Sequence, residues 1–243
     1  MSALRTLRVA CLLAGGMFWV ASPASAAPIV FDLDQDGCSG LGGCGLSHYG
    51  TVTLDQGSNN NTVHVALDLD PGVIFALSGA GQALEFNIFG NPSITIDNLT
   101  PGFEIGPAPA TASTFGTFMY SVHCHDNDKK ADPPDLLGCG NGTSPPQNPG
   151  PLEFDVITAA LLSPLDFTAN GGGFFFASDI GAPDGDGGFL TGNVAANGFQ
   201  QTGDCVGNDC GIPLDVPEPS TVAFFAAGLL AFGAWFRRRK VKA

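Results

Sequence analysis

The chain has few basic residues, and most of them lie at its two ends. Only nine of the 243 residues are Lys or Arg, against 23 that are Asp or Glu. Residues 27–216 contain 22 of the acidic side chains, two lysines (Lys129 and Lys130) and no arginine, so their net charge is −20. Such a surface repels phosphate backbones, and it has no guanidinium group for a bidentate phosphate contact. We therefore expect no nucleic-acid partner.

The sequence also lacks the motifs of common enzyme classes. It contains no Gly-x-Ser-x-Gly nucleophile elbow and no dinucleotide-binding fingerprint. Both tryptophans, Trp19 and Trp235, lie in the end segments, so the middle of the chain lacks the aromatic platforms typical of sugar-processing clefts. We predict a protein without enzymatic activity. Two alternatives stay open: a secreted polysaccharide hydrolase that uses two of the many carboxylates, and a calcium-dependent ligand-binding module.

The first 26 residues have the features of a secretory signal peptide. Arg5 and Arg8 provide the positive start, residues 9–20 provide the apolar stretch, and Ala24-Ser25-Ala26 provides the small-residue cleavage site. The pattern predicts export through the Sec machinery and removal of residues 1–26. The remaining domain would then fold on the oxidising side of the membrane.

The last 27 residues contain three features in a fixed order. Pro217-Glu218-Pro219 is followed by an uncharged run, residues 221–236, and then by the basic cluster Arg237-Arg238-Arg239-Lys240. As a helix this run spans about 24 Å, which is short of the roughly 30 Å hydrocarbon core, and snorkelling arginines can cover the difference. We expect a transmembrane helix with a cytoplasmic basic tail, so that the rest of the chain lies outside the inner membrane.

This ordered combination resembles the PEP-CTERM sorting signal, which is also catalogued as an ice-binding protein C-terminal domain. The resemblance implies an exosortase substrate of a Gram-negative, exopolysaccharide-producing bacterium, processed near Pro217-Glu218-Pro219. It also implies a membrane-anchored precursor that later reaches the cell surface or the extracellular matrix, where exopolysaccharide of the biofilm is the expected partner. The second family name gives no reason to expect ice binding.

Alternating apolar and polar residues predict an all-β domain over residues 27–200. Val63, Val65, Leu67 and Leu69 alternate with polar or small residues, as in a strand with one solvated face. Leu84, Phe86 and Ile88 alternate with Glu85 and Asn87 in the same way. We expect an antiparallel β-sandwich with jelly-roll-like connections, because Gly, Pro, Asn or Asp separates the runs. The predicted strands are residues 29–33, 49–54, 63–69, 84–88, 94–96, 115–122, 152–157, 165–167, 174–177 and 189–194.

Two segments do not fit the strand pattern. Residues 126–151 are rich in Pro, Gly and Asn and predict a long loop, and residues 201–216 predict a linker to the sorting signal at 217–243. Six cysteines remain after signal-peptide removal, and this even number favours disulfides over zinc, since no CxxC pair occurs. Six cysteines allow several pairings. Their spacing favours the local pairs Cys38–Cys44, Cys124–Cys139 and Cys205–Cys210.

One acidic segment resembles the start of a calcium-binding loop. Asp32, Asp34 and Asp36 alternate and are followed by Gly37, and carboxylates in this pattern can surround a hard cation. The twelfth position of such a loop would be Gly43 instead of a bidentate acid. The competing interpretation is therefore a strand with a solvated acidic face. Calcium is the only cofactor that the acidic residues suggest.

A second segment carries two histidines. His123 and His125 lie at positions i and i+2, on one face of a predicted strand, where two imidazoles can hold zinc or copper. Cys124 between them is expected to form a disulfide, and no third histidine lies nearby in the sequence. Exposed polar residues next to a loop are thus the competing interpretation.

Overall fold

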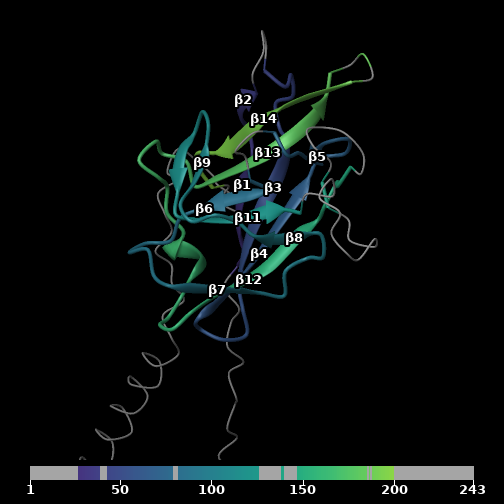
Figure 1. Cartoon of the computed structure of the whole chain (residues 1–243). Coiled ribbons are helices and arrows are strands. Elements are labelled where there is room, and N and C mark those ends of the chain that lie inside the picture. The colour runs from purple at the N-terminus through teal and green to yellow at the C-terminus, as the bar shows by residue number, and fades with distance from the viewer. Residues whose placement is uncertain are drawn as a thin grey trace, which may run out of the picture. The chain divides into compact units, whose positions relative to one another are not determined.

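The structure is a computed structural model of the whole chain. It describes residues 27–38, 43–78, 82–125, 138–139, 147–184, 186 and 188–199. The chain divides into two compact units, residues 1–202 and 203–243, and all described residues lie in the first unit. These residues form antiparallel β-sheets and one short 3-10 helix (Figure 1). The predicted all-β antiparallel class is confirmed, and the jelly-roll-like connectivity stays a prediction.

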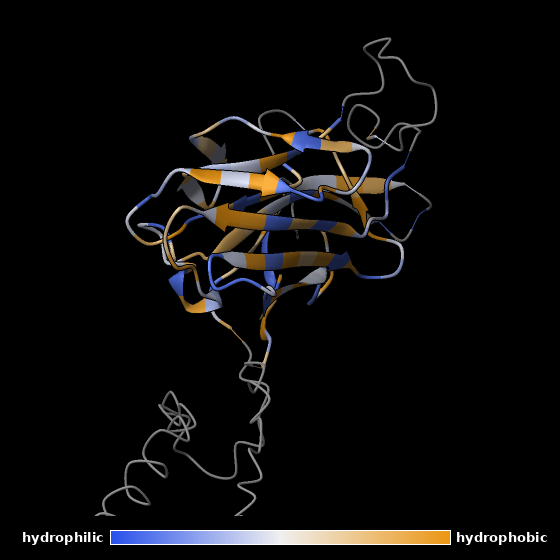
Figure 2. Cartoon of the chain, turned by 90° about the horizontal axis from the view of Figure 1, so that it is seen from below, coloured by the Kyte–Doolittle hydropathy of each residue, from blue (hydrophilic) through white to orange (hydrophobic). Residues whose placement is uncertain are grey.

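The first sheet has five strands, and its neighbours are all antiparallel. Along β4, Val63, Val65 and Leu67 are fully buried, whereas the residues between them are only partly covered. Figure 2 shows the alternating hydropathy along the strands, and the burial pattern of β4 shows that this alternation separates an apolar inner face from a polar outer face. In sheet order the strands are β1 (Ile29–Asp32), β3 (Gly50–Gln56), β4 (Thr62–Leu69), β12 (Leu152–Thr158) and β7 (Ile94–Asp97).

The second sheet contains most of the other strands. A separate two-stranded hairpin lies against it and consists of β9 (Ala110–Ala112) and β10 (Gly116–Phe118). In sheet order the strands are β2 (Gln35–Cys38), β14 (Phe189–Ala196), β13 (Phe176–Pro183), β6 (Leu84–Phe86), β11 (Tyr120–Cys124) and β8 (Phe103–Ile105), while β5 (Ile74–Phe75) pairs with β13.

The inner faces of the two sheets share one hydrophobic core. Phe154 of the first sheet packs on Phe86 of the second, with ring centroids 5.9 Å apart. Phe31 and Phe176 make a second contact between the sheets, at 4.9 Å and with T-shaped geometry. Burial of each such side chain contributes roughly 1.5–3 kcal/mol. This core holds the two sheets together.

Three of the predicted elements differ in the structure. The predicted strand at residues 115–122 divides into β10 in the hairpin and β11 in the second sheet. Residues 165–167 were expected as a strand, but Pro164–Asp166 is a 3-10 helix, so this prediction is wrong. Ser163 and Asp166 form a capping box that satisfies the first backbone amides, and Pro164 supplies a helical φ. The predicted strand at residues 29–33 ends at Asp32, and a separate strand, β2, begins at Gln35 in the other sheet.

Several predictions fall on residues that the structure does not describe. These are the signal peptide, the linker at 201–216, the sorting motif, the span at 221–236 and the basic cluster. The helix in the described part of the chain is too short to cross a membrane. Of the predicted loop at 126–151, residues 138–139 and 147–151 are described, and the turn-forming Gly150 has a positive φ of 86°.

Candidate functional site

The outer face of the first sheet carries a row of titratable side chains across four strands. The register aligns Asp55 on β3 with His64 on β4, His64 with Asp155 on β12, and Asp155 with Asp97 on β7. The described residues contain no Lys or Arg that could neutralise this row. We use the name acidic face for the carboxylates on this side of the sheet, which are Asp32, Asp55, Asp68, Asp97, Glu153 and Asp155.

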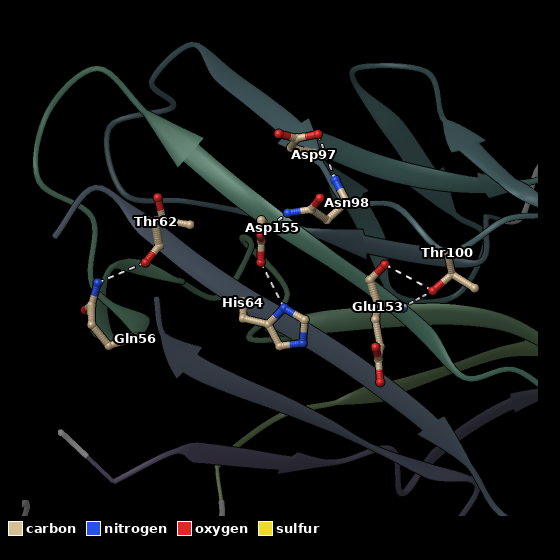
Figure 3. A network of polar contacts seen from close by, with 8 residues as sticks. All are labelled: Gln56, Thr62, His64, Asp97, Asn98, Thr100, Glu153 and Asp155. Carbon is tan, nitrogen blue, oxygen red and sulfur yellow. Dashed lines mark hydrogen bonds and ion pairs between the residues drawn. The ribbon is translucent and has the colours of Figure 1, made fainter. Parts of the chain in front are cut away.

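Asp155 is the centre of a hydrogen-bond network on the acidic face (Figure 3). Its Oδ1 lies 2.8 Å from Nδ1 of His64, and its Oδ2 accepts a hydrogen bond of 2.7 Å from Nδ2 of Asn98. Burial alone would raise the pKa of Asp155, but the contacts with Asn98 and His64 lower it below the ordinary value. These contacts offset the repulsion expected between Asp155 and Asp97, which face each other directly.

Asp32 lies at the edge of this face and contacts a histidine. His48 has its Nδ1 atom 2.7 Å from Oδ2 of Asp70 and its Nε2 atom 3.5 Å from Oδ1 of Asp32. Burial favours the neutral ring, yet the hydrogen bonds and charges of Asp70 and Asp32 raise the pKa of His48. The predicted calcium ligand Asp32 is thus part of a histidine–carboxylate cluster.

Asp36 has a different environment, because it anchors the loop that the Cys38–Cys44 disulfide closes. Its carboxylate accepts hydrogen bonds from the hydroxyl of Tyr49 (2.6 Å) and from the amides of Cys44 (2.8 Å) and Cys38 (2.9 Å). Burial would raise the pKa of Asp36, but these hydrogen bonds lower it. A Cβ atom on Gly43 would collide with the carboxylate, so the loop needs glycine there.

The structure does not bring the three predicted calcium ligands together. Asp32 is on β1 in the first sheet, Asp36 is on β2 in the second, and exposed Asp34 between them accepts a hydrogen bond from Gln35. In the described part of the chain, Asp36 groups with Cys38 and Cys44, whose sulfurs form a disulfide with each other. The sequence could not place these carboxylates, because the break between β1 and β2 sends them to different sheets.

Replacement of Tyr49 by Phe tests the role assigned to Asp36. Tyr49 is fully buried, and the variant loses only the hydroxyl group that donates to Asp36 and accepts from the amide of Leu46. We expect a loss of about 1 kcal/mol in the free energy of unfolding, since water screens the partly exposed carboxylate. Urea unfolding measures this value. An unchanged midpoint for Tyr49→Phe contradicts the assignment.

The two histidines predicted as metal ligands have separate partners. Nδ1 of His123 lies 2.9 Å from Oε1 of Gln82, and Nδ1 of His125 lies 3.5 Å from Oε2 of Glu104. Cys124 between them is bonded to Cys139. The structure therefore contains the disulfides Cys38–Cys44 and Cys124–Cys139, and the predicted pair Cys205–Cys210 lies outside the described residues.

Two acidic side chains are buried on the other side of the molecule, on the outer face of the second sheet. Glu85 is 1% exposed and Asp179 is fully buried. Asp179 accepts hydrogen bonds from the hydroxyl and the amide of Ser78, whereas neither carboxyl oxygen of Glu85 has a hydrogen-bond partner. The sequence pattern placed Glu85 away from the core but gave no sign that a hairpin covers it.

Three clefts in the described part of the chain are lined by uncharged residues. One of about 460 Å³ is bordered by Asn87, Phe89 and Asn170, and one of about 430 Å³ by Ile105 and Tyr120. The third, of about 270 Å³, is apolar and ends at Phe199. None of these three clefts is lined by a carboxylate, so they offer no acid pair to a glycosidase mechanism.

Comparison with known protein families gives a match at the C-terminus. Residues 215–240 match the family described as the PEP-CTERM protein-sorting motif, which confirms the resemblance seen in the sequence. No curated protein and no solved structure gives a significant match to the chain. The motif supports a surface protein that is exported, held at the membrane as a precursor and sorted by exosortase.

Proposed function

We propose that the chain is a non-enzymatic protein of the extracellular matrix, which exosortase processes and which binds biofilm exopolysaccharide through divalent cations shared with its acidic face. The observation that supports this proposal is the sorting motif at residues 215–240 in a chain whose described domain presents six carboxylates on one sheet face. The described residues contain no Lys or Arg that would compete for those carboxylates, and the histidines that contact them are His64, at Asp155, and His48, at Asp32.

The geometry of a sheet suits cation sharing with a polymer. Neighbouring strands lie about 4.8 Å apart, so Asp155 and Asp97 are separated by one strand spacing, and Asp55 and Asp155, on either side of His64, by two. Calcium takes six to eight oxygen ligands, and one or two exposed carboxylates leave most of these positions to the partner. Each cation bridge between a protein carboxylate and the polymer is weak. The affinity for a polyanion with many acid groups therefore depends on how many such bridges form at the same time.

The experiment is retention of the exported protein on immobilised polygalacturonate, with calcium or with a chelator. We expect retention in calcium, release by the chelator, and a loss of about tenfold in affinity when Asp55→Asn, Asp68→Asn and Glu153→Gln are combined. The side chains of these three residues make no described hydrogen bond or ion pair, so the substitutions remove charge and leave the packing intact.

The matched control removes the same amount of charge elsewhere. Asp34→Asn, Asp186→Asn and Glu104→Gln lie away from the acidic face, and this combination should retain calcium-dependent binding. Equal losses in the two triple variants would mean that net charge alone is responsible, and the acidic face would not be a site. Indifference of the wild-type protein to calcium and chelator would contradict the proposal, and release of reducing ends would favour the hydrolase alternative.

A further inference from the structure

The hairpin formed by β9 and β10 covers part of the outer face of the second sheet. Its apolar side chains Ala112, Phe115 and Phe118 pack on Ala177 and Ala195 of β13 and β14. This cluster is separate from the main core and much smaller. Figure 1 shows β9 beside β6 and β13, the two strands that it contacts. The hairpin is thus a third layer held by a satellite cluster.

Side chains provide the polar attachments of the hairpin. Nδ2 of Asn170 donates to the carbonyl of Phe115 at 2.8 Å, Nδ2 of Asn193 donates to Oγ of Ser113 at 3.2 Å, and Oγ1 of Thr114 donates to the carbonyl of Gly37 at 3.4 Å. The backbone of β9 and β10 pairs within the hairpin. Because so few groups attach it, the hairpin can separate from the sheet without breaking either main sheet.

Glu85 lies beneath this hairpin in an environment that does not suit a charge. Its cross-strand neighbours are Ser121 on β11 and Ala177 on β13, and the backbone of Ala112 on β9 lies above it. The hydroxyl of Ser121 donates to the carbonyl of Pro107, not to Glu85. The amide of Ala112 faces the carboxyl group, but both carboxyl oxygens lack a hydrogen bond of normal geometry. A buried carboxylate in this state has lost its hydration and gains only the weak interaction with the amide of Ala112 in exchange.

The other titratable groups around Glu85 add no stabilising charge that the structure shows. On β13, Asp179 lies two residues from Ala177, the cross-strand neighbour of Glu85. Burial raises the pKa of Asp179 to about 7, and its carboxylate accepts hydrogen bonds from the hydroxyl and the amide of Ser78, which lies outside the hairpin, so opening of the hairpin leaves these contacts in place. On β11, His123 contacts Gln82, and Glu104 on β8 lies opposite it. A second unsatisfied atom, Oδ1 of Asn193, lies under the same hairpin.

We propose that the hairpin β9–β10 is a proton-gated lid, which lies closed on the second sheet while Glu85 is protonated and opens when Glu85 ionises. Opening returns the Glu85 carboxylate to water and exposes Asn193, whose amide contacts Ser113 of the hairpin. The protein would then present a second oxygen-rich acidic surface, which is hidden in the closed form.

The direction of the pH effect follows from the two states of Glu85. Burial is the main cause that raises the pKa of Glu85 from 4.5 to about 8 in the closed form, and the charge of Asp179 adds to it. In the open form the carboxyl group is solvated and has its ordinary pKa. The closed form therefore binds the proton more tightly than the open form does. The resulting stabilisation of the closed form is complete below pH 4.5 and is lost as the pH rises toward 8. Between pH 6 and pH 9 the opening equilibrium should increase about 100-fold.

Hydrogen exchange of the exported protein tests this proposal. The measurement is the protection factor of the amides of residues 110–118 at pH 6 and pH 9, corrected for the intrinsic exchange rate at each pH. We expect protection to fall about 100-fold in the wild-type protein and to stay constant in Glu85→Gln, whose side chain cannot ionise. Glu85→Met is a second uncharged variant with the same expected result, in case the amide of Gln disturbs the fold.

Two controls separate lid opening from other events. Glu153→Gln changes an exposed carboxyl group on the acidic face and should behave as the wild-type protein does. The amides of β4 and β12 report on the main core and should keep their protection at both pH values. An equal loss of protection in β4 and β12, or the same pH response in both Glu85 variants, would overturn the proposal.

Discussion

Replacement of Pro217, Glu218 and Pro219 by alanine is expected to abolish processing of the exported protein. The motif matches the PEP-CTERM family at residues 215–240, and the apolar run and the basic cluster that follow it stay intact in this variant. The chain should therefore still enter the membrane and remain there as the precursor. Antibody detection in membrane and extracellular fractions measures the result, and we expect the extracellular form to disappear.

The matched control changes three residues of the preceding linker. Ile212, Pro213 and Leu214 lie upstream of the family match, and their replacement by alanine should leave processing and release as in the wild-type protein. Release of the motif variant at the wild-type level would show that Pro217-Glu218-Pro219 is not the processing signal. The cleavage that releases the protein would then depend on another segment, and the proposed processing by exosortase would lose its main support.

Removal of the Cys124–Cys139 disulfide should have the largest effect on stability among the changes considered in the described domain. Both sulfurs are fully buried in the main core, and the bond closes a loop with a sequence separation of 15. Loss of this constraint on the unfolded chain costs about 3 kcal/mol when both cysteines are replaced by alanine. Urea unfolding of the oxidised proteins measures the difference in the free energy of unfolding.

The second disulfide provides the comparison for this prediction. Cys38–Cys44 closes a loop with a separation of 6, so its removal should cost about 2 kcal/mol by the same argument. The hydrogen bonds that Asp36 accepts from the amide of Cys44 and the hydroxyl of Tyr49 also hold this loop and should survive in part. A loss below about 1 kcal/mol for the Cys124–Cys139 variant would contradict the prediction that this bond stabilises the domain by constraining the unfolded chain.

The alternation of apolar and polar residues predicts the two main sheets well, because it reports which side chains face the shared core. Val63, Val65 and Leu67 are buried as expected, and most predicted runs match strands. The same alternation cannot show whether the outer face is solvated. Glu85 occupies an outward position on β6 and is nevertheless 1% exposed, because the β9–β10 hairpin, a contact distant in sequence, covers it.

The candidate metal ligands show a second limit to what a sequence pattern can predict. Asp36 was a candidate ligand because of its spacing from Asp32 and Asp34, but its partners are Tyr49 and the amides of the disulfide loop. Residue type and spacing describe a possible ligand and do not reveal the donors that the fold brings to it. The short strands β2, β5, β8 and β9 were missed for a related reason, since their pairing comes from neighbouring strands and their own residues have weak patterns.

The central claim, an exosortase-processed matrix protein held by divalent cations, is tested most directly by one mass measurement. The sample is the protein that a calcium chelator releases from the extracellular matrix of the native host. We predict an intact mass that begins after residue 26, ends near Pro217, and is lighter than the fully reduced form by the hydrogens of three disulfides. A product that retains residues 217–243, or a matrix fraction from which the chelator releases none of the protein, would contradict the account.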